Sequence, residues 1–412
     1  MLYDNAQLIS LYAKAFKFTG KEAYRDVIIE SILFAERELL DKTGGFYSSI
    51  DADSEGEEGS FYIWTKDEFD SVLEDDELKR IGGDLYDIRP SGNWEDGKNI
   101  LHISKDANEL AEKYDFGIEE IRNKILQINT KLFDERMKRE RPSTDDKILT
   151  SWNALMIKAY LDAYTALGNP VYLDKAVEIE DFITESMGKD DGGLYRTFKG
   201  GSAAINAFSE DYALMIDANL KLYQVTFNEN YLDKAVDLMN YTLDKFESED
   251  GYFFFTSKDD PPLVAQNKEV SDNVIPASNS IMAKNLYSLG TITANDEWVD
   301  KSMTMLSGMY PEIMNSNYPS YYSNWLQLMA NMIFPYYEVA IVGEESMAKN
   351  LAMQKEYDPF CLYLGGNTEG SLALLEDKLQ VGETYIYVCR NKVCKLPVKD
   401  PIKARELLST GM

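Results

Sequence analysis

Residues 152–195 begin W-N-A-L-M-I-K-A-Y-L-D-A-Y-T-A-L-G-N-P-V-Y-L-D-K-A-V and end D-G-G-L-Y. Residues 4–47 have the same layout, beginning D-N-A-Q-L-I-S-L-Y-A-K-A-F-K-F-T-G-K-E-A-Y and ending T-G-G-F-Y. The two stretches align without a gap, so that Asn5 falls on Asn153 and Gly20 falls on Gly168. In both, a first run of apolar residues at helical spacing is followed by a turn, a second helix and a Gly-Gly-aromatic segment. Each stretch therefore predicts a helix pair that is closed by a short extended arm.

Further copies of the unit follow along the chain. A third begins at Asp211 with D-Y-A-L-M-I-D-A-N-L-K-L-Y, a fourth at Ser278 with S-N-S-I-M-A-K-N-L-Y, and a fifth first helix at Ser323 with S-N-W-L-Q-L-M-A-N-M. Helix pairs of this kind bury their apolar faces by stacking on their neighbours. We predict an all-α, (α/α)6 toroid with a central cleft, incomplete by one helix pair because only five first helices are recognisable. Its two open ends would expose apolar faces, which predicts reduced stability or self-association.

Two regions depart from the repeat. The toroid is expected to span residues 1–335, with an inserted region at about 48–147 that elaborates the cleft. From about residue 336 the apolar, β-branched stretches E-V-A-I-V-G, F-C-L-Y-L-G-G and T-Y-I-Y-V-C-R alternate with helical ones. Residues 336–412 are therefore predicted to form a small C-terminal α/β region.

Composition excludes several classes of protein. The formal net charge of −29 argues against a nucleic-acid or anionic-membrane partner. No apolar run is long enough for a membrane span, and the first residues do not resemble a signal peptide, so we expect a cytoplasmic protein. Three cysteines, Cys361, Cys389 and Cys394, are too few and too widely spaced for a redox or zinc pair, and we expect them to be reduced. With His102 as the one histidine, no metal site or cofactor is expected.

An acidic loop opens the inserted region. Asp51, Asp53 and Glu55 begin like a calcium-binding loop, but its twelfth position is Tyr62 instead of glutamate, so the EF-hand interpretation fails. A cation site of another kind and a solvated acidic turn both remain open.

One column of the repeat is polar. The second position of the five first helices holds Asn5, Asn153, Tyr212, Asn279 and Asn324, and the preceding position holds Asp4, Trp152, Asp211, Ser278 and Ser323. Asp4, Asp211, Ser278 and Ser323 are predicted N-caps, because their oxygens can accept hydrogen bonds from the first-turn amides. The same column is also predicted to line the cleft, and the two interpretations are compatible.

Several strings resemble a known family. M-L-Y-D-N-A-Q-L, the stretch G-G-F-Y to F-Y-I-W that contains D-A-D-S-E-G-E-E-G, L-T-S-W-N, and Y-I-Y-V-C-R-N-K-V-C-K-L-P are similar to the spermatogenesis-associated, thioredoxin-domain-containing proteins. The resemblance covers nearly the whole chain. It implies a six-hairpin glycosidase-like toroid, similar to N-acylglucosamine 2-epimerase. It also implies an N-terminal thioredoxin-like domain, a first helix pair and a His-containing stretch before Met1, all of which we expect in the full-length protein and which this chain lacks.

Two functions are open on this fold. A glycoside hydrolase needs two carboxylates across a cleft, and Asp4, Glu210 and Asp211 are the candidates. A pair of catalytic histidines, as in an epimerase, is argued against by His102 alone. The interpretation we favour slightly is a carbohydrate-binding barrel without catalysis, because an inherited fold confers no activity. The predicted ligand-binding residues are Tyr3, Asn5, Asp51, Asp53, Glu55, Trp64, Lys147, Trp152, Asn153 and Asn279, with a loop salt bridge as the alternative role for Lys147 and Asp146.

Overall fold

The chain folds into two compact units. The computed structural model describes residues 1–261 and 265–409. Unit 1 consists of Met1–Ser48 and Asp146–Met412, and unit 2 consists of Ser49–Asp145. The inserted region predicted at about 48–147 thus corresponds to unit 2.

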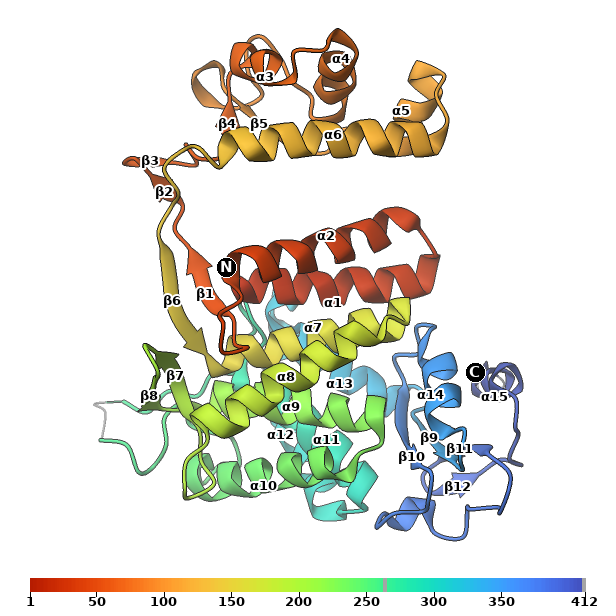
Figure 1. Ribbon diagram of the computed structural model, residues 1–412. Coiled ribbons are helices and arrows are strands. Elements are labelled where there is room, and N and C mark those ends of the chain that lie inside the picture. The colour runs from red at the N-terminus through yellow and green to blue at the C-terminus, as the bar shows by residue number, and fades with distance from the viewer. Residues whose placement is uncertain (262–264, 410–412) are drawn as a thin grey trace. The chain divides into compact units, whose positions relative to one another are not determined.

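Unit 1 is built from helix pairs. The first helices are α1 (Leu2–Thr19), α7 (Thr150–Leu167), α9 (Ser209–Thr226), α11 (Ser278–Thr293) and α13 (Ser323–Ile333). The second helices are α2 (Glu22–Leu39), α8 (Pro170–Met187), α10 (Glu229–Phe246) and α12 (Asp296–Asn315). Each second helix packs on the first helix of its own pair, and the first helices pack in the order α1, α7, α9, α11, α13 (Figure 1). The predicted helical-hairpin fold and its five first helices are confirmed.

Three of the first helices form the interior of unit 1. Helices α7, α9 and α11 are buried along most of their length, whereas α2 and α10 bury only one face. A helix that is apolar nearly all round belongs inside a protein, and an amphipathic helix belongs on its surface. The sequence difference between the two kinds of helix therefore decides which of them is inner and which is outer.

A repeated turn follows the outer helices. The backbone N–H groups of Gly44, Gly192 and Gly251 donate to Asp41, Lys189 and Ser248, at 3.1, 3.1 and 3.0 Å. These glycines have φ values of +100°, +85° and +85°, in the left-handed region that glycine adopts without strain. The turn folds the chain back into a short antiparallel arm, so that Phe46, Leu194 and Phe253 come to equivalent positions.

The polar column of the repeat fastens these arms. The Asn153 amide accepts a hydrogen bond from the Phe46 N–H at 2.7 Å and donates to the Phe46 carbonyl at 3.0 Å. Asn279 binds Phe253 in the same way, at 2.8 and 2.9 Å. Tyr212 does so with its hydroxyl, which accepts from the Leu194 N–H at 2.9 Å. In each case the inner helix of one pair holds the arm of the preceding pair, and we call this contact the arm clamp.

Four strands lie at the ends of the arms. They are β1 (Tyr47–Ile50), β6 (Thr144–Leu149), β7 (Tyr195–Lys199) and β8 (Ser202–Asn206), in the sheet order β1-β6-β7-β8. Strands β6 and β7 are antiparallel, with Ile148 opposite Phe198, and β7 and β8 form a hairpin. The sheet places β7 beside the start of α7.

Unit 2 has its own core. Its helices are α3 (Lys66–Leu73), α4 (Asp76–Leu85), α5 (Ala107–Tyr114) and α6 (Ile118–Arg136), with the short helix η1 (Glu95–Gly97) and the short strands β2 (Asp53–Ser54), β3 (Glu57–Glu58), β4 (Ile63–Trp64) and β5 (Asn99–Ile100). Helix α6 packs against the other three α-helices. Trp64, Phe69, Ile81 and Ile121 are buried between them.

The C-terminal region has the predicted α/β composition. Its elements are β9 (Tyr337–Val342), α14 (Ser346–Gln354), β10 (Cys361–Gly366), η3 (Ala373–Leu375), β11 (Tyr385–Arg390), β12 (Val393–Cys394) and α15 (Pro401–Ser409), preceded by η2 (Pro319–Tyr322). The strand order is β10-β9-β11-β12, with β9 and β10 parallel. The region packs on the end of α9, where Asn350 donates to the Gln224 and Val225 carbonyls at 2.9 and 3.1 Å. It is therefore continuous with the helix pairs within unit 1.

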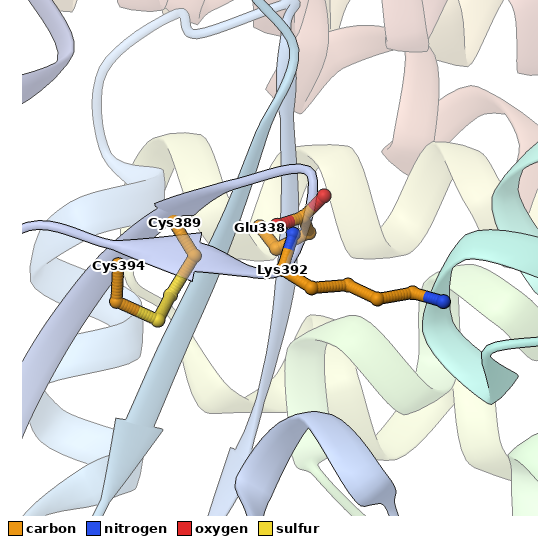
Figure 2. The surroundings of a disulfide bond; sticks show 4 residues. All are labelled: Glu338, Cys389, Lys392 and Cys394. Carbon is orange, nitrogen blue, oxygen red and sulfur yellow. Dashed lines mark hydrogen bonds between the residues drawn. A yellow bond between two sulfur atoms is a disulfide. The ribbon is translucent and has the colours of Figure 1, made fainter.

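The prediction that all three cysteines are reduced is wrong. Cys389 and Cys394 form a disulfide across the β11–β12 hairpin (Figure 2). Cys361 is free. Asn391 and Lys392 form a two-residue turn with φ values of 50° and 67°, which places the two cysteines opposite each other in register. In Figure 2 the Lys392 side chain extends away from the disulfide, and its backbone N–H donates to Glu338 at 3.2 Å.

Apolar side chains remain exposed on α1, the first helix of the row, and on the outer helix α12. On α1, Leu8, Leu11 and Phe18 are 46%, 58% and 77% exposed, and on α12 Tyr310 and Met314 are also exposed. Apolar faces of this kind are typical of surfaces on which another element packs. The self-association expected from the sequence stays a prediction. Among the described residues, no helix is both long and apolar enough to cross a bilayer.

The arm clamp predicts a specific cost for its loss. Asn153→Ala leaves the buried N–H and carbonyl of Phe46 without their partner, so the free energy of unfolding should fall by about 3 kcal/mol. Tyr212→Phe removes one acceptor and should cost about 1–2 kcal/mol. Asn5 donates only to the Met1 carbonyl at 2.8 Å, and Asn5→Ala should change stability by less than about 0.5 kcal/mol. Urea denaturation measures all three, and an Asn153→Ala variant as stable as Asn5→Ala would contradict the clamp.

The disulfide predicts a thiol count. The chain denatured without reductant should react with one equivalent of a thiol reagent, since only Cys361 is free. After reduction it should react with three, the number of cysteines in the sequence. Cys361→Ser serves as the control and should lower each count by one. Three reactive thiols before reduction would show that the hairpin is open.

Candidate functional site

The N-terminal ends of the inner helices are held by carboxylates. The first amides of a helix have no partner within the helix and need an acceptor. Asp211 accepts from the Ser151 N–H of α7 at 3.0 Å and from the Phe208 N–H that precedes α9 at 2.9 Å. Because Asp211 is fully buried, one carboxylate ties together the starts of two neighbouring inner helices.

The same arrangement recurs further along the row. Asp272 accepts from the Ala277 N–H at the start of α11 at 3.0 Å and from the Asn324 N–H of α13 at 2.8 Å. Glu269 accepts from the Ser278 N–H at 3.0 Å. A carboxylate at a helix N-terminus is also favoured by the helix dipole. These contacts therefore gather acidic side chains at one end of the inner helices.

The predicted N-caps are wrong. The N-cap positions of α1, α9, α11 and α13 are Met1, Phe208, Ala277 and Tyr322. The predicted residues Asp4, Asp211, Ser278 and Ser323 lie inside the first turn. The helices begin earlier than the polar residues suggest, because carboxylates from elsewhere satisfy several of the first amides.

One cation lies among these acids. The Arg196 guanidinium of β7 is 2.9 Å from an Asp211 oxygen and 3.4 Å from a Glu210 oxygen, and it stacks 4.6 Å above the centre of the Phe208 ring. Its side chain is 19% exposed, and that of Glu210 is 8% exposed. We call Arg196, Glu210, Asp211 and Glu269 the rim cluster.

Burial raises the pKa values of two carboxyl groups in the rim cluster. It raises the pKa of Glu210, with a further contribution from the neighbouring Asp211 charge. Arg196 opposes this increase, while the charge of Glu269 adds to it. Burial also raises the pKa of Asp211, against the effect of Arg196 and two backbone N–H groups. Glu210 is thus a carboxyl group that holds its proton more tightly than usual, beside a second carboxylate from a different segment.

The structure brings together two of the three predicted catalytic residues. Glu210 and Asp211 share Arg196, whereas Asp4 is half-exposed and lies 3.6 Å from the Met1 amine. Of the predicted aromatic residues, the Tyr3 and Trp152 rings meet edge to face at 4.7 Å. Trp152 directly follows Ser151, so this pair lies next to a residue bound to Asp211.

Other predicted ligand-binding residues have structural contacts instead. Asn153 and Asn279 are fully buried and form arm clamps, so we do not retain them as ligand contacts. Asn5 donates to the Met1 carbonyl. Lys147 is exposed on β6, and its neighbour Asp146 forms an ion pair with Lys199 at 2.5 Å.

Four predicted residues belong to unit 2. Asp51 accepts from the Asp53 N–H at 3.3 Å and from the Ser143 hydroxyl at 3.1 Å. Glu55 is an exposed turn residue with a φ of 55°. Trp64 is 1% exposed in the core of this unit, with Arg139 lying 4.1 Å from the centre of its ring, so it has no face for a ligand. Within residues 1–261 and 265–409, no group of three or more His, Cys, Asp or Glu side chains is arranged to hold a metal ion.

Sequence reasoning missed Arg196, Glu269 and Asp272. Arg196 follows the recognised G-G-L-Y segment, and an arginine directly after a turn could have been paired with the acids at Glu210 and Asp211. Glu269 and Asp272 lie in a connection that has no counterpart in the other repeats, so the repeat offers no signal for them.

A hollow lies apart from these residues. It has a volume of about 340 Å³ and lies between α11, α12, α13 and the β11–β12 turn. Tyr287, Asp296, Tyr336, Glu338 and Lys392 are among its lining residues. None of the residues predicted from the sequence lines it.

The fold and the rim cluster define a helical-hairpin domain with a buried acidic site, in which the pKa values of Glu210 and Asp211 are raised. No known protein-family profile matches the chain. It is 28% identical to human spermatogenesis-associated protein 20 over 99% of its own length and 57% of that protein. It is 31% identical to an uncharacterised protein of Caenorhabditis elegans over 75% of this chain and 46% of that protein. The chain thus spans about half the length of these curated relatives.

Solved structures give weaker likenesses. A D-mannose isomerase is 13% identical with a TM-score of 0.38, and each chain is covered to 75%. The GH76 α-mannanase BT2949 of Bacteroides thetaiotaomicron is also 13% identical, with a TM-score of 0.35, covering 76% of this chain and 74% of that one. Scores this low assign no activity here, and the fold rests on the helix pairs themselves.

The raised pKa of Glu210 predicts a pH-dependent stability change. The folded chain holds this proton more tightly than the unfolded chain, so the wild type loses stability as the pH rises from the ordinary glutamate pKa through the raised one. Glu210→Gln removes the charge and should be more stable than the wild type at pH 7. This gain should disappear below about pH 4, the range of an unperturbed glutamate.

The control for this experiment is Glu178→Gln. Glu178 is exposed on α8, and its carboxylate pairs with Lys175 at 2.6 Å. Its stability should follow the wild type at every pH. A Glu210→Gln variant that is less stable than the wild type at pH 7 and equal to it in acid would show that the glutamate is stabilised as an anion.

Proposed function

We propose that unit 1 binds a carbohydrate-type ligand at the rim cluster. A polyol has many hydroxyl groups, each of which can donate and accept, so its site needs both kinds of partner close together. Arg196 donates and the carboxylates of Glu210 and Asp211 accept. Convergent polar groups with perturbed pKa values are a general indicator of a ligand site.

The single observation that carries this proposal is the raised pKa of the Glu210 carboxyl group beside Arg196. Its carboxyl lies beside an arginine, yet burial and two nearby acids keep its pKa raised. A residue that served only to hold the fold would be paired more favourably. The Trp152 ring packs edge to face on Tyr3 at 4.7 Å and follows Ser151, whose N–H donates to Asp211.

Glycoside hydrolysis is the second candidate. It uses a protonated carboxyl as general acid and a second carboxylate as base or nucleophile. Glu210 and Glu269 come from different segments, and the charge of Glu269 raises the pKa of Glu210. This pair replaces the pairs proposed from the sequence alone, because Asp211 is engaged by two backbone amides and Arg196.

Saccharide binding tests the first candidate. Saturation-transfer NMR with a panel of mono- and disaccharides should find a binder for the wild type. Glu210→Gln should weaken its affinity by about tenfold, because the charge and the ionisable proton are lost. Glu178→Gln should bind like the wild type. The proposal fails if no saccharide binds the wild type, or if Glu210→Gln binds equally well.

The same variants separate binding from catalysis. With aryl glycosides, a hydrolase should lose about a hundredfold or more of its rate in both Glu210→Gln and Glu269→Gln. A wild type that binds saccharides but releases no aglycone supports the binding function alone.

A further inference from the structure

The inner helices carry charged residues in the middle of their length. Lys158 and Lys284 lie five residues after the clamp residues Asn153 and Asn279, and Asp217 lies five residues after Tyr212. One helical turn further on, Lys14, Asp162 and Lys221 lie nine residues after Asn5, Asn153 and Tyr212. Residues four apart share one face of a helix. With Lys17 they form what we call the lysine cluster: Lys14, Lys17, Lys158, Lys221 and Lys284, with Asp162 and Asp217.

Ion pairs and charge interactions join these side chains across four helices. Asp162 of α7 lies 4.0 Å from Lys14 of α1 and 3.6 Å from Lys221 of α9. Lys158 of α7 forms an ion pair with Asp217 of α9. The charge of Lys14 also reaches Lys284 of α11, although α1 and α11 are not neighbours in the helix row. The cluster therefore gathers on the surface that the four helices share.

Two of the lysines have neutral partners. Lys17 donates to the Thr165 hydroxyl at 2.6 Å. Lys284 donates to the Asn324 and Gln327 side-chain oxygens at 3.0 and 2.9 Å. An ammonium group has three N–H donors and needs a counter-charge when it leaves water. These contacts satisfy donors without supplying the negative charge.

The lysine cluster is short of anions. It holds five lysines and two aspartates within a chain whose net charge is −29, and the charges of Asp272 and Asp358 offset those of Lys284 and Lys17 only in part. Burial lowers the pKa of Lys17 to about 7, with a further contribution from Lys221. Burial lowers that of Lys284 to about 8 against the opposing effect of Asp217, and Lys158 contributes to the decrease. The local excess of positive charge is thus costly in the free chain.

The cluster remains within reach of water. The side chains of Lys158, Asp217 and Lys221 are 25%, 20% and 22% exposed, and that of Lys14 is 49% exposed. The remaining acidity of the chain repels large polyanions, but at physiological ionic strength charges beyond about 8 Å are largely screened. A small anion can therefore approach the lysines where a nucleic acid cannot.

We propose that the lysine cluster, on the shared face of α1, α7, α9 and α11, is a binding site for a small polyanion. Lysine ammonium groups bind phosphate and carboxylate as point charges with freely rotating donors. A ligand with two or more negative charges would balance the lysines that lack a carboxylate partner. Phosphate esters and polycarboxylates share this chemistry. The proposal does not depend on carbohydrate binding at the rim cluster, because it concerns different residues and is tested with non-sugar anions.

Calorimetry of the full chain tests it directly. Pyrophosphate and citrate are titrated separately at constant ionic strength and pH 7.5, which distinguishes phosphate from carboxylate ligands. At least one should bind with a Kd of about 1 mM or lower. Lys284→Met and Lys17→Met should each weaken that binding by about tenfold or more. Lys175→Met is the matched control, since Lys175 pairs with Glu178 on the surface of α8, and should bind like the wild type.

Proton uptake is the second readout. A bound anion favours the charged form of Lys17 and Lys284, so binding near pH 7.5 should take up protons, measured from the heat in buffers of different ionisation enthalpy. The charged groups that face these two lysines are Lys14, Lys158, Lys221, Asp162, Asp217, Asp272 and Asp358. The uptake should shrink in both variants.

Folding of the variants is not a confounding factor. Lys284→Met removes an ammonium group without a carboxylate partner, so it should fold and be at least as stable as the wild type. The proposal is overturned if neither anion binds the wild type at about 10 mM. It is also overturned if Lys175→Met weakens binding as much as Lys284→Met, or if binding proceeds without proton uptake.

Discussion

The arm clamp is the interaction on which the order of the helix pairs depends. One side chain at the start of α7, α9 and α11 binds the backbone of the preceding arm, at Phe46, Leu194 and Phe253 respectively. Because the clamp joins successive pairs, it acts as a neighbour-to-neighbour term in the stability of a repeat array. The helix starts then lie side by side, and Asp211 and Asp272 can each serve two of them. Both the rim cluster and the lysine cluster follow from that alignment.

The two clusters show how one scaffold separates charge along its length. Carboxylates collect at the N-terminal ends of the inner helices, where unpaired amides and helix dipoles attract them. Lysines collect one to three turns further along the same helices. Burying these charged side chains costs free energy. In natural proteins, buried charges with perturbed pKa values concentrate at functional sites. The same repeat therefore supplies both the packed helices that stabilise the fold and the buried charged side chains among them.

The repeat could be read from the sequence because its signals are local. The sequence itself contains these signals: the helical spacing, the turns at Gly44 and Gly192, and the column that includes Asn153 and Asn279. The partners of this column could not be predicted, because they are backbone groups of the preceding arm, and a backbone group has no sequence signature. Asp272 and Glu269 were equally hidden, since their segment has no second copy. Lys158 and Lys284 did leave a signal in the sequence, because both are lysines at the same position of two largely apolar helices.

Unit 2 enters and leaves unit 1 through β1 and β6, which are adjacent in one sheet. A segment whose two ends already lie together adds little loop-closure entropy, however long it becomes. The stability of the helix row therefore depends little on the length of the segment inserted there. A module can therefore be exchanged, enlarged or deleted at this junction during evolution, while the clamp between Phe46 and Asn153, which flank the insertion, keeps its geometry.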